Sequence, residues 1–401
     1  MVNKKVRNPS IDVVRIFALF LVVSVHFFLN IGYYSATMAG EKMLLATVFR
    51  TLGKACVPMF ILLTGYLMQR KTLSAKYYLG IVKTLAIYVL ASVVCILFKN
   101  YYLDRGLTLK MAIAGILDFS AADYAWYVEM YIGLFLAIPF LNAMYHGMGT
   151  KKRKLVLVGT FIFLSSAYTV FNIFDFHTPG WWSNPRISVS YDEIVPDFYS
   201  EIYPFTIYLI GAALSDFKVK MKRIPNILLI VAITSMVGAY SYYRSYGRTF
   251  IWGSWQGDRA VFIVAIAALL VVLISGFDMT KAPVWIKKPL KVIADSVLGA
   301  YLVSYVFDTI FYKKLLTAVP EFYNRYPYYF VIVPAVFICS ILTSMGLNVV
   351  WWMISTPITK LFRLARRTDG TKTIPEPVAL DEVKDAKAEA EEKQPELTEI
   401  K

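Results

Sequence analysis

Long apolar stretches recur along the whole chain and are separated by short segments rich in charged residues. Ten of these stretches approach the roughly 20 apolar residues that a helix needs to cross a bilayer. They cover residues 11–33, 44–68, 78–98, 124–145, 153–174, 198–216, 224–243, 260–277, 292–312 and 327–355. Unbroken apolar runs favour helices over barrel strands, in which apolar and polar residues alternate. The pattern predicts an all-α, polytopic membrane helical bundle of about ten transmembrane helices.

The composition supports a membrane protein. Hydrophobic residues make up 58% of the chain and charged residues 17%, whereas soluble domains have about 45–50% and about 25%. The first stretch lacks a convincing signal-peptidase pattern, so we expect it to stay as a membrane anchor. The three cysteines lie inside apolar runs without a CxxC pair, and the three histidines are scattered. We therefore expect neither a metal site nor a permanently bound cofactor.

The basic residues predict an orientation. The net charge is +15, and residues 369–401 carry ten acidic and five lysine side chains (−5), which leaves +20 on the rest. The basic excess lies in short connections such as "QRKTLSAK", "TKKRK" and "KLFRLARR". By the positive-inside rule, both termini are predicted to be cytoplasmic, with anionic lipid rather than nucleic acid as the partner of this charge. We expect a membrane domain over 1–368 and a disordered acidic tail over 369–401.

The first apolar stretch carries Arg15 and His26 along its length. Eleven helical positions amount to about three turns and about 16.5 Å of axis, so both side chains share one face. Ionisable groups inside a membrane are rare and are functional candidates by default. The pair suits a long anionic ligand. Arg15 would bind a phosphate through two hydrogen bonds, and His26 would act as a general base at the reactive end of the ligand.

Structural explanations for the same residues remain open at this point. An arginine near a helix end often extends to the lipid headgroups, and Asp12, one turn earlier, is a ready ion-pair partner for Arg15. A lone histidine in a membrane can simply hydrogen-bond a neighbouring helix. The spacing alone does not decide between these explanations and a site.

Five fragments together resemble one known family. They are "IDVVRIFALFLVVSVH", "KACVPMFILLTGYLMQRK", "AWYVEMYIGLFLAIPFLNAM", "YPFTIYLIGAAL" and "DSVLGAYLVSYVF". In this order, and over about residues 8–360, they resemble the acyltransferase-3 family of membrane O-acyltransferases. The resemblance implies a ten-helix bundle with a channel for cytoplasmic acyl-CoA, usually acetyl-CoA, and a sugar acceptor at or beyond the outer face. It also implies that Arg15 and His26 are the functional pair.

The chain departs from this family at several positions. Tyr124 stands where the family often has a histidine before the tryptophan of the fourth span, and Ser304 stands where it often has another. The family commonly has two basic residues after the second span. This chain has Lys83 at one of these positions and Gly80 at the other. His26 is therefore the one histidine placed for catalysis in the membrane.

Further polar residues in the apolar stretches extend the candidate site. Glu129 should face the bundle interior, where it could orient His26 or bind an acceptor hydroxyl, or else pair with a basic group such as Lys54. Lys54 could instead hold donor phosphates, and Arg70, Lys71 and Lys83 could form a basic entrance for CoA. Asp295 and Ser296 suit a helix N-cap, and Asp308 has no assigned role. The candidate catalytic residues are His26 and Glu129, and the candidate substrate-binding residues are Arg15, Lys54, Lys83 and Asp12.

Two functions of different classes follow. The first is an O-acyltransferase of the cell membrane that moves an acetyl group from acetyl-CoA to a hydroxyl of a cell-surface or lipid-linked carbohydrate. The second is a proton-coupled transporter or flippase of an anionic amphiphile, although no internal repeat supports it. A subunit that keeps the fold without the chemistry is a third, weaker hypothesis. The acceptor and the oligomeric state are not readable from the sequence.

Overall fold

The structure, a computed structural model, describes residues 7–188 and 190–368. Within these ranges the regular structure is helical, with one isolated β-bridge between Met38 and Tyr246 and no strand. The predicted tail, 369–401, lies outside the described residues. The α-helices are α1 (Pro9–Asn30), α2 (Gly40–Gly53), α3 (Cys56–Met68), α4 (Ala75–Tyr78), α5 (Val82–Tyr101), α6 (Leu109–Leu117), α7 (Trp126–Gly147), α8 (Lys151–Ser166), α9 (Tyr168–Phe171), α10 (Tyr203–Asp216), α11 (Arg223–Ser245), α12 (Val261–Ser275), α13 (Val284–Asp295), α14 (Val297–Ala318) and α15 (Tyr329–Thr368).

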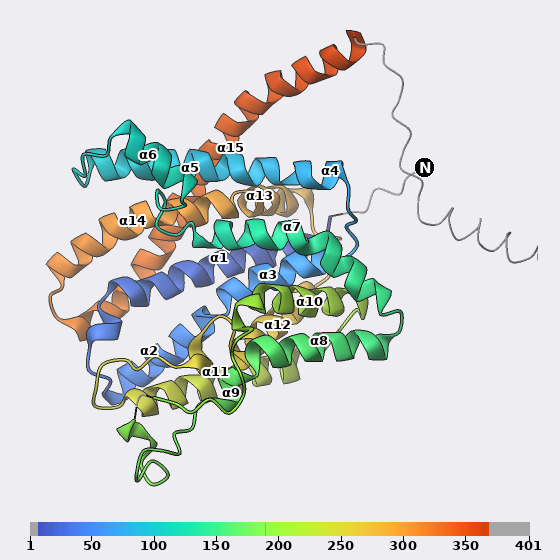
Figure 1. The fold of residues 1–401 in the computed structure, drawn as a ribbon. Helices are drawn as coiled ribbons and strands as arrows, with labels where there is room; N and C mark the ends of the chain where they lie inside the picture. Colours follow the sequence, from blue (N-terminus) through green and yellow to red (C-terminus); the bar gives the residue numbers. More distant parts are fainter. Residues whose placement is uncertain (1–6, 189, 369–401) are drawn as a thin grey trace, which may run out of the picture. The chain divides into compact units, whose positions relative to one another are not determined.

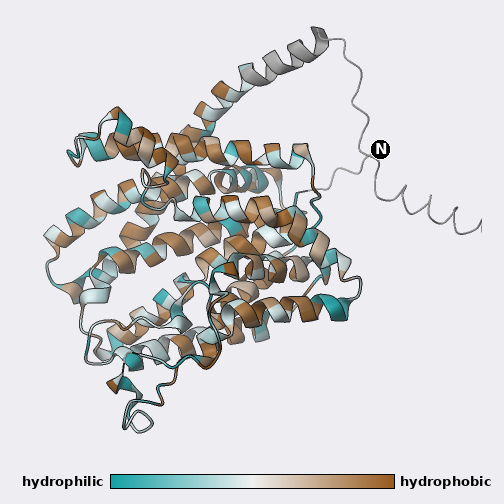
Figure 2. Ribbon diagram, viewed as in Figure 1, coloured by the Kyte–Doolittle hydropathy of each residue, from teal (hydrophilic) through white to brown (hydrophobic). Residues whose placement is uncertain are grey.

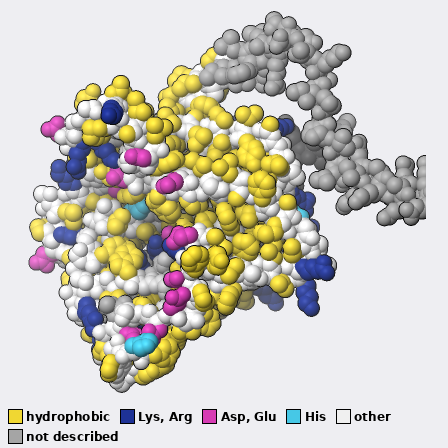
Figure 3. All heavy atoms as spheres, in the orientation of Figure 1, with side chains coloured by type: hydrophobic (Ala, Val, Ile, Leu, Met, Phe, Trp, Pro, Cys, Tyr) yellow, Lys and Arg dark blue, Asp and Glu magenta, His cyan; other side chains and the backbone are white. Residues whose placement is uncertain are grey.

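The all-α membrane fold predicted from the sequence is confirmed. In the described part of the chain, seven helical segments are long and apolar enough to cross a membrane, or eight if the bent pair α13–α14 counts as one span. Brown apolar residues run along these helices in Figure 2. Apolar side chains also cover most of the flank over α7, α8 and α10 in Figure 3. The chain is a multi-pass integral membrane protein.

Two of the ten predicted spans form helices that are shorter than expected. α8 has 16 residues and α10 has 14, which correspond to about 24 and about 21 Å, less than the roughly 30 Å of a hydrocarbon core. The fifth apolar stretch is divided because α8 ends at Ser166 and a separate short helix, α9, follows. The sixth begins with a 3-10 turn at Ser200–Ile202 before α10 starts.

Other spans contain breaks that hydropathy did not reveal. The second span is divided into α2 and α3, and Lys54 and Ala55 lie at the break. α13 and α14 meet at an angle of 63° next to Ser296. The loop predicted between the third and fourth spans contains the nine-residue helix α6.

α1 lies among five helices and contributes many buried residues to the core. It packs against α2, α3, α12, α13 and α14, and Figure 1 shows it running through the bundle beside α3 and α14. Its buried residues include Val14, Ala18, Leu19 and Phe27. A helix enclosed in this way is held at both ends and along its length, so residues on it have a fixed position relative to their neighbours.

Two glycines allow α3 and α10 to pack closely. A Cβ atom added at Gly65 would lie 2.0 Å from the backbone oxygen of Tyr208, and one at Gly211 would lie 2.0 Å from that of Leu62. Small residues at a membrane helix crossing let the two backbones approach each other. This crossing fixes α3, whose next face carries Phe60, Thr64 and Met68 toward the cavity described below.

Several of the predicted cytoplasmic connections meet at one end of the bundle. Asn142 donates to the backbone oxygens of Met68 and Lys71 at 2.9 and 2.7 Å, and Lys154 forms a 2.8 Å ion pair with Asp216. The exits of the second, fourth and sixth predicted spans are therefore on the same side, as expected. Which side of the membrane this is remains a prediction.

Candidate active site

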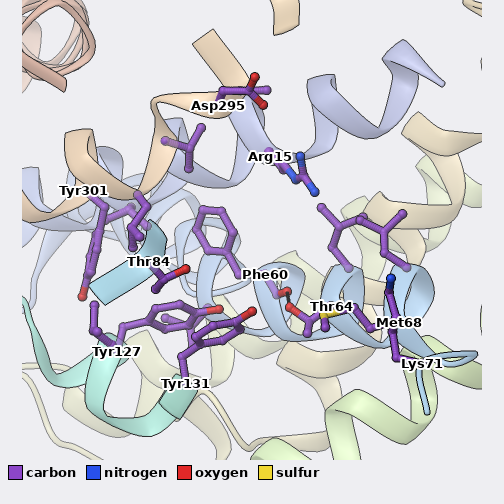
Figure 4. A pocket seen from close by; sticks show the side chains of 18 residues that line it. Arg15, Phe60, Thr64, Met68, Lys71, Thr84, Tyr127, Tyr131, Asp295 and Tyr301 are labelled. Atoms are coloured by element: carbon purple, nitrogen blue, oxygen red, sulfur yellow. Dashed lines mark hydrogen bonds between the residues drawn. The ribbon is translucent and has the colours of Figure 1, made fainter. Parts of the chain in front are cut away.

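A cavity of about 520 Å³ opens beside α1 and is lined by α1, α3, α5, α7, α13 and α14. Figure 4 shows Arg15 and Lys71 toward one end of this cavity and Tyr127 and Tyr301 toward the other. Its walls between these ends are largely apolar and include Val22, Phe60 and Leu63. Asp295 also lines the cavity near Arg15. A cavity that has two basic residues and one acidic residue toward one end and apolar walls along its length suits a long ligand with a charged head.

Arg15 lines this cavity with its guanidinium available to a ligand. Its side chain is 32% exposed, and the nearest carboxylate atom, Asp12 Oδ1, lies 3.7 Å away. No hydrogen bond ties Arg15 within the described ranges. The predicted pairing with Asp12 is thus only a loose contact.

Asp12 is instead held by Arg7. Arg7 Nε donates to Asp12 Oδ2 at 2.8 Å and Arg7 Nη2 donates to Oδ1 at 2.5 Å, while Arg7 Nη2 also reaches Asp295 at 3.0 Å. The bond to Asp12 is the main reason that the pKa of the Arg7 guanidinium is raised. Because Arg7 satisfies Asp12, which is buried, the charge of Arg15 stays free to meet an anion.

Lys71 is the second basic residue of the cavity, and Lys83 is not part of it. Lys71 follows α3 and is exposed, and it forms no ion pair in the part of the chain that the structure describes. Lys83 is exposed on α5 and lies outside the cavity lining, although its neighbour Thr84 belongs to it. The structure therefore places Lys71, and not Lys83, beside Arg15.

Tyrosine rings close the far end of the cavity. Tyr127 and Tyr301 line it, and their ring centroids lie 6.0 Å apart in an edge-to-face arrangement. Tyr301 in turn stacks near Tyr124, at 6.2 Å. Neither Tyr124 nor His26 belongs to the lining. These rings separate the chamber from the histidine.

His26 lies one helical turn beyond Val22, a residue of the cavity wall. Its Nδ1 is 3.1 Å from Asp308 Oδ2, and its side chain is 12% exposed. Asp308 lies on α14 and is 1% exposed. With Nδ1–H bonded to this buried carboxylate, Nε2 is the nitrogen left to take a proton, which is the arrangement of an oriented general base.

Tyr124 completes this group from a third part of the chain. Its hydroxyl donates to the same Asp308 oxygen at 2.9 Å, and its ring lies 4.0 Å from the imidazole at a tilt of 36°. Asp308 Oδ1 has no hydrogen-bond partner among the described residues. His26 of α1, Asp308 of α14 and Tyr124, which precedes α7, form one connected cluster.

Two sequence-predicted residues lie apart from this cluster. Glu129 is exposed on α7 and forms no hydrogen bond or ion pair with any described residue, so the expectation that it faces the bundle interior beside His26 is not met. Lys54 forms a 2.8 Å ion pair with Asp258, and neither residue lines the cavity. The structure supplies Lys54 with a carboxylate partner other than Glu129.

Asp308 and Tyr124 contribute to the candidate site, although the sequence alone assigns neither of them a role. The sequence singled out Asp308 only as a carboxylate inside an apolar stretch, and Tyr124 only as a departure from a family histidine. Asp308 contacts His26 across 282 positions of the chain, and Tyr124 contacts Asp308 across 184. The one available signal was the cost of placing a carboxylate in a membrane without a partner.

One further group of ligand-type residues lies in the loop between α9 and α10. Atoms of Asp175, His177 and Asp192 are within 4.8 Å of one another. Asp175 accepts from the backbone nitrogens of His177 and Thr178, and Asp192 accepts from that of Phe176. These hydrogen bonds explain the cluster as a set of side chains that hold the loop backbone in place.

A family comparison agrees with this geometry. The family described as an acyltransferase domain matches residues 8–345, which include every residue of the cavity and of the histidine cluster. The chain therefore belongs to the acyltransferase-3 family and is a membrane acyltransferase. No curated protein and no solved structure matches the chain.

Proposed function

We propose that this acyltransferase moves an acetyl group from acetyl-CoA to a hydroxyl of a cell-surface or lipid-linked carbohydrate, with His26 as the general base. One observation carries the proposal: an imidazole bonded to a buried carboxylate lies one turn past a cavity whose other end holds an arginine that is only loosely paired with Asp12. Membership of an acyltransferase family favours the enzyme over a transporter.

The donor would occupy the cavity with its phosphates near Arg15 and Lys71. A guanidinium can donate two parallel hydrogen bonds to phosphate oxygens, and a lysine adds a second positive charge. The apolar walls would hold the pantetheine arm, which leads the thioester toward the tyrosine rings. Arg15 and His26 are about 16.5 Å apart along the helix axis, a separation that requires a long arm of this kind between phosphate and reactive carbon.

The chemical step follows from the His26 cluster. His26 Nε2 removes the proton of the acceptor hydroxyl as its oxygen attacks the thioester carbonyl. The carbon–sulfur bond then breaks, and the imidazolium returns the proton to the leaving CoA sulfur. Asp308 keeps the ring in the required tautomer and stabilises the positive charge that forms, and such base catalysis is worth about 10²–10⁴-fold in rate.

A second route differs only in the order of events. The acyl group would first pass to His26 Nε2, with release of CoA, and then to the acceptor. The two routes are separated by pre-steady-state kinetics: a burst of CoA release without acceptor identifies the acyl-histidine route, and its absence identifies direct transfer.

The test uses sealed inside-out vesicles that contain the full chain and its native acceptor pool, supplied with acetyl-labelled acetyl-CoA. We expect the wild type to release CoA and to place label in lumenal or lipid-linked glycan. His26→Ala should abolish both signals. Arg15→Ala should raise the donor concentration needed for half-maximal rate by about 10–100-fold, since losing a charged hydrogen bond costs about 1.5–3 kcal/mol.

Matched variants serve as controls. His177→Ala removes an exposed loop histidine, and Arg153→Ala removes an exposed arginine at the start of α8. Both should retain wild-type transfer. Unchanged transfer in His26→Ala would remove His26 from the chemistry, whereas uptake of an anionic amphiphile without CoA release would restore the transporter hypothesis.

A further inference from the structure

A second cavity borders the end of α1. It has a volume of about 270 Å³ and is formed by Phe27 and Phe28 of α1, by residues of α2, by Tyr329 and Phe330 at the start of α15, and by Tyr326 in the 3-10 segment before it. Phe28 follows His26 by two positions, or about 200° around the helix. The same turn of α1 thus presents His26 to α14 and Phe28 to this second cavity, which we call the α1–α2–α15 groove.

The groove is open at an apolar part of the surface. Phe49 and Phe330, at its rim, are 61% and 79% exposed, and all three helices belong to candidate membrane spans. Pockets that enclose a whole drug-sized ligand have about 300–1,000 Å³. A groove of smaller volume that opens sideways suits a segment of one hydrocarbon chain.

One charged residue marks the end of this groove. Lys42 is the only charged residue in its lining, and it is exposed and forms no ion pair within residues 7–188 and 190–368. It lies in the first turn of α2, whose N-cap residue Ala39 supplies no side-chain hydrogen bond. Glu41 is the acidic residue of the same turn, and the N–H groups that Ala39 leaves uncapped point outward, where they favour an anion beside Lys42.

We propose that the α1–α2–α15 groove binds the apolar chain of the lipid that carries the acceptor carbohydrate, with the lipid phosphate at Lys42. This inference rests on the proposed function and specifies its acceptor as a phosphate-bearing, long-chain lipid. Lys42 opens α2 at the end of the bundle where α1 ends, and Asn30, the last residue of α1, lies one turn from His26. A sugar joined to a phosphate at Lys42 therefore lies at the same end of α1 as His26.

The experiment measures lipid binding directly, apart from catalysis. The purified full chain in detergent is titrated with a polyprenyl phosphate and examined by native mass spectrometry, with phosphatidylcholine as competitor. We expect one polyprenyl phosphate per chain, which a tenfold excess of phosphatidylcholine does not displace. Ala46→Phe, which fills the groove from α2, should weaken binding at least tenfold, and Lys42→Gln should weaken it about three- to tenfold.

Matched variants test whether the effects belong to the groove. Val93→Phe enlarges an exposed side chain on α5, and Lys76→Gln removes an exposed lysine of α4; neither should change binding. Leu45→Trp, at the exposed rim of the groove, repeats the block without altering a buried position, in case Ala46→Phe fails to fold.

Two results would overturn the inference. One is equal binding by Ala46→Phe, Leu45→Trp and the wild type, and the other is displacement of the probe by equimolar phosphatidylcholine. A transfer assay separates this failure from that of the proposed function. The groove variants should lose transfer to a lipid-linked acceptor but keep CoA release with a short, water-soluble sugar acceptor, whereas failure of the proposed function removes CoA release with every acceptor.

Discussion

At the scale of single residues, the two oxygens of Asp308 have different surroundings. Oδ2 is 3.1 Å from His26 Nδ1 and accepts from the Tyr124 hydroxyl at 2.9 Å, while Oδ1 has no hydrogen-bond partner among the described residues. A buried carboxylate is stabilised by such donors and by a positive charge beside it. In the proposed mechanism, Asp308 would stabilise the positive charge that forms on His26.

Replacing Asp308 tests this positioning role. We expect Asp308→Asn to lower kcat by about 10²-fold or more, since the amide can hold His26 in the wrong tautomer. KM for acetyl-CoA should stay near its wild-type value, because Asp308 does not line the cavity beside Arg15 that we propose binds the donor. Steady-state CoA release by the reconstituted variant measures both constants.

The control and a graded variant accompany this measurement. Asp278→Asn, in the exposed turn before α13, should keep full activity. Tyr124→Phe leaves the ring and removes one hydrogen bond to a charged group, worth about 1.5–3 kcal/mol, so its kcat should fall less than that of Asp308→Asn. A kcat for Asp308→Asn within twofold of wild type would show that His26 works without this carboxylate.

The sequence predicted some of these residues and not others for a physical reason. Arg15 and His26 lie on one helix, so the helical period alone places them on one face. The link between His26 and Asp308 depends on how α1 packs against α14, which the period of either helix does not contain. Lys83 and Glu129 were misplaced for the same reason, because the direction each side chain faces is set by neighbouring helices.

At the scale of elements, the crossing of α3 and α10 has the least tolerance for change. We expect Gly65→Ala and Gly211→Ala each to lower stability, because the added Cβ would meet backbone atoms that cannot move aside independently. Overpacking of this kind costs about 1–3 kcal/mol. Thermal unfolding of the detergent-purified variants, followed by size-exclusion chromatography, measures the loss.

Gly133→Ala is the matched control for this crossing. It lies within α7, and nothing lies within 4 Å of an added Cβ. This variant should unfold at the wild-type temperature or slightly above, since alanine favours a helix by about 1 kcal/mol over glycine. Equal melting temperatures for all three variants would mean that the close packing of α3 against α10 does not contribute to stability.

The helices themselves were largely predictable, and their breaks were not. Each of the ten apolar stretches contains helix, because burial in hydrocarbon requires internal backbone hydrogen bonds. The break at Lys54 and the 63° bend beside Ser296 leave the average hydropathy nearly unchanged. The bend is braced by Ser344 and Asn348 of α15, which bond to Ser296, and such partners are distant in sequence.

At the scale of the whole molecule, the orientation in the membrane remains a prediction that labelling can test. Ser74, after α3, and Ser183, in the loop between α9 and α10, are replaced singly by cysteine in intact cells. The native Cys56 and Cys95 are buried, and Cys339 is replaced by alanine. An impermeant maleimide should label Ser183→Cys from outside and Ser74→Cys only after the cells are opened, and the reverse pattern would invert the topology.

The tyrosine rings at the end of the donor cavity have a consequence for the membrane itself. A continuous passage from Arg15 to the far side of His26 would be a route for protons and small ions as well as for an acyl chain. Tyr127, Tyr301 and Tyr124 stand across that route with ring centroids 6.0–6.2 Å apart. On the proposed mechanism, these rings would let an acyl group pass toward one face of the bilayer while they block ions, so that the electrochemical gradient across it stays intact.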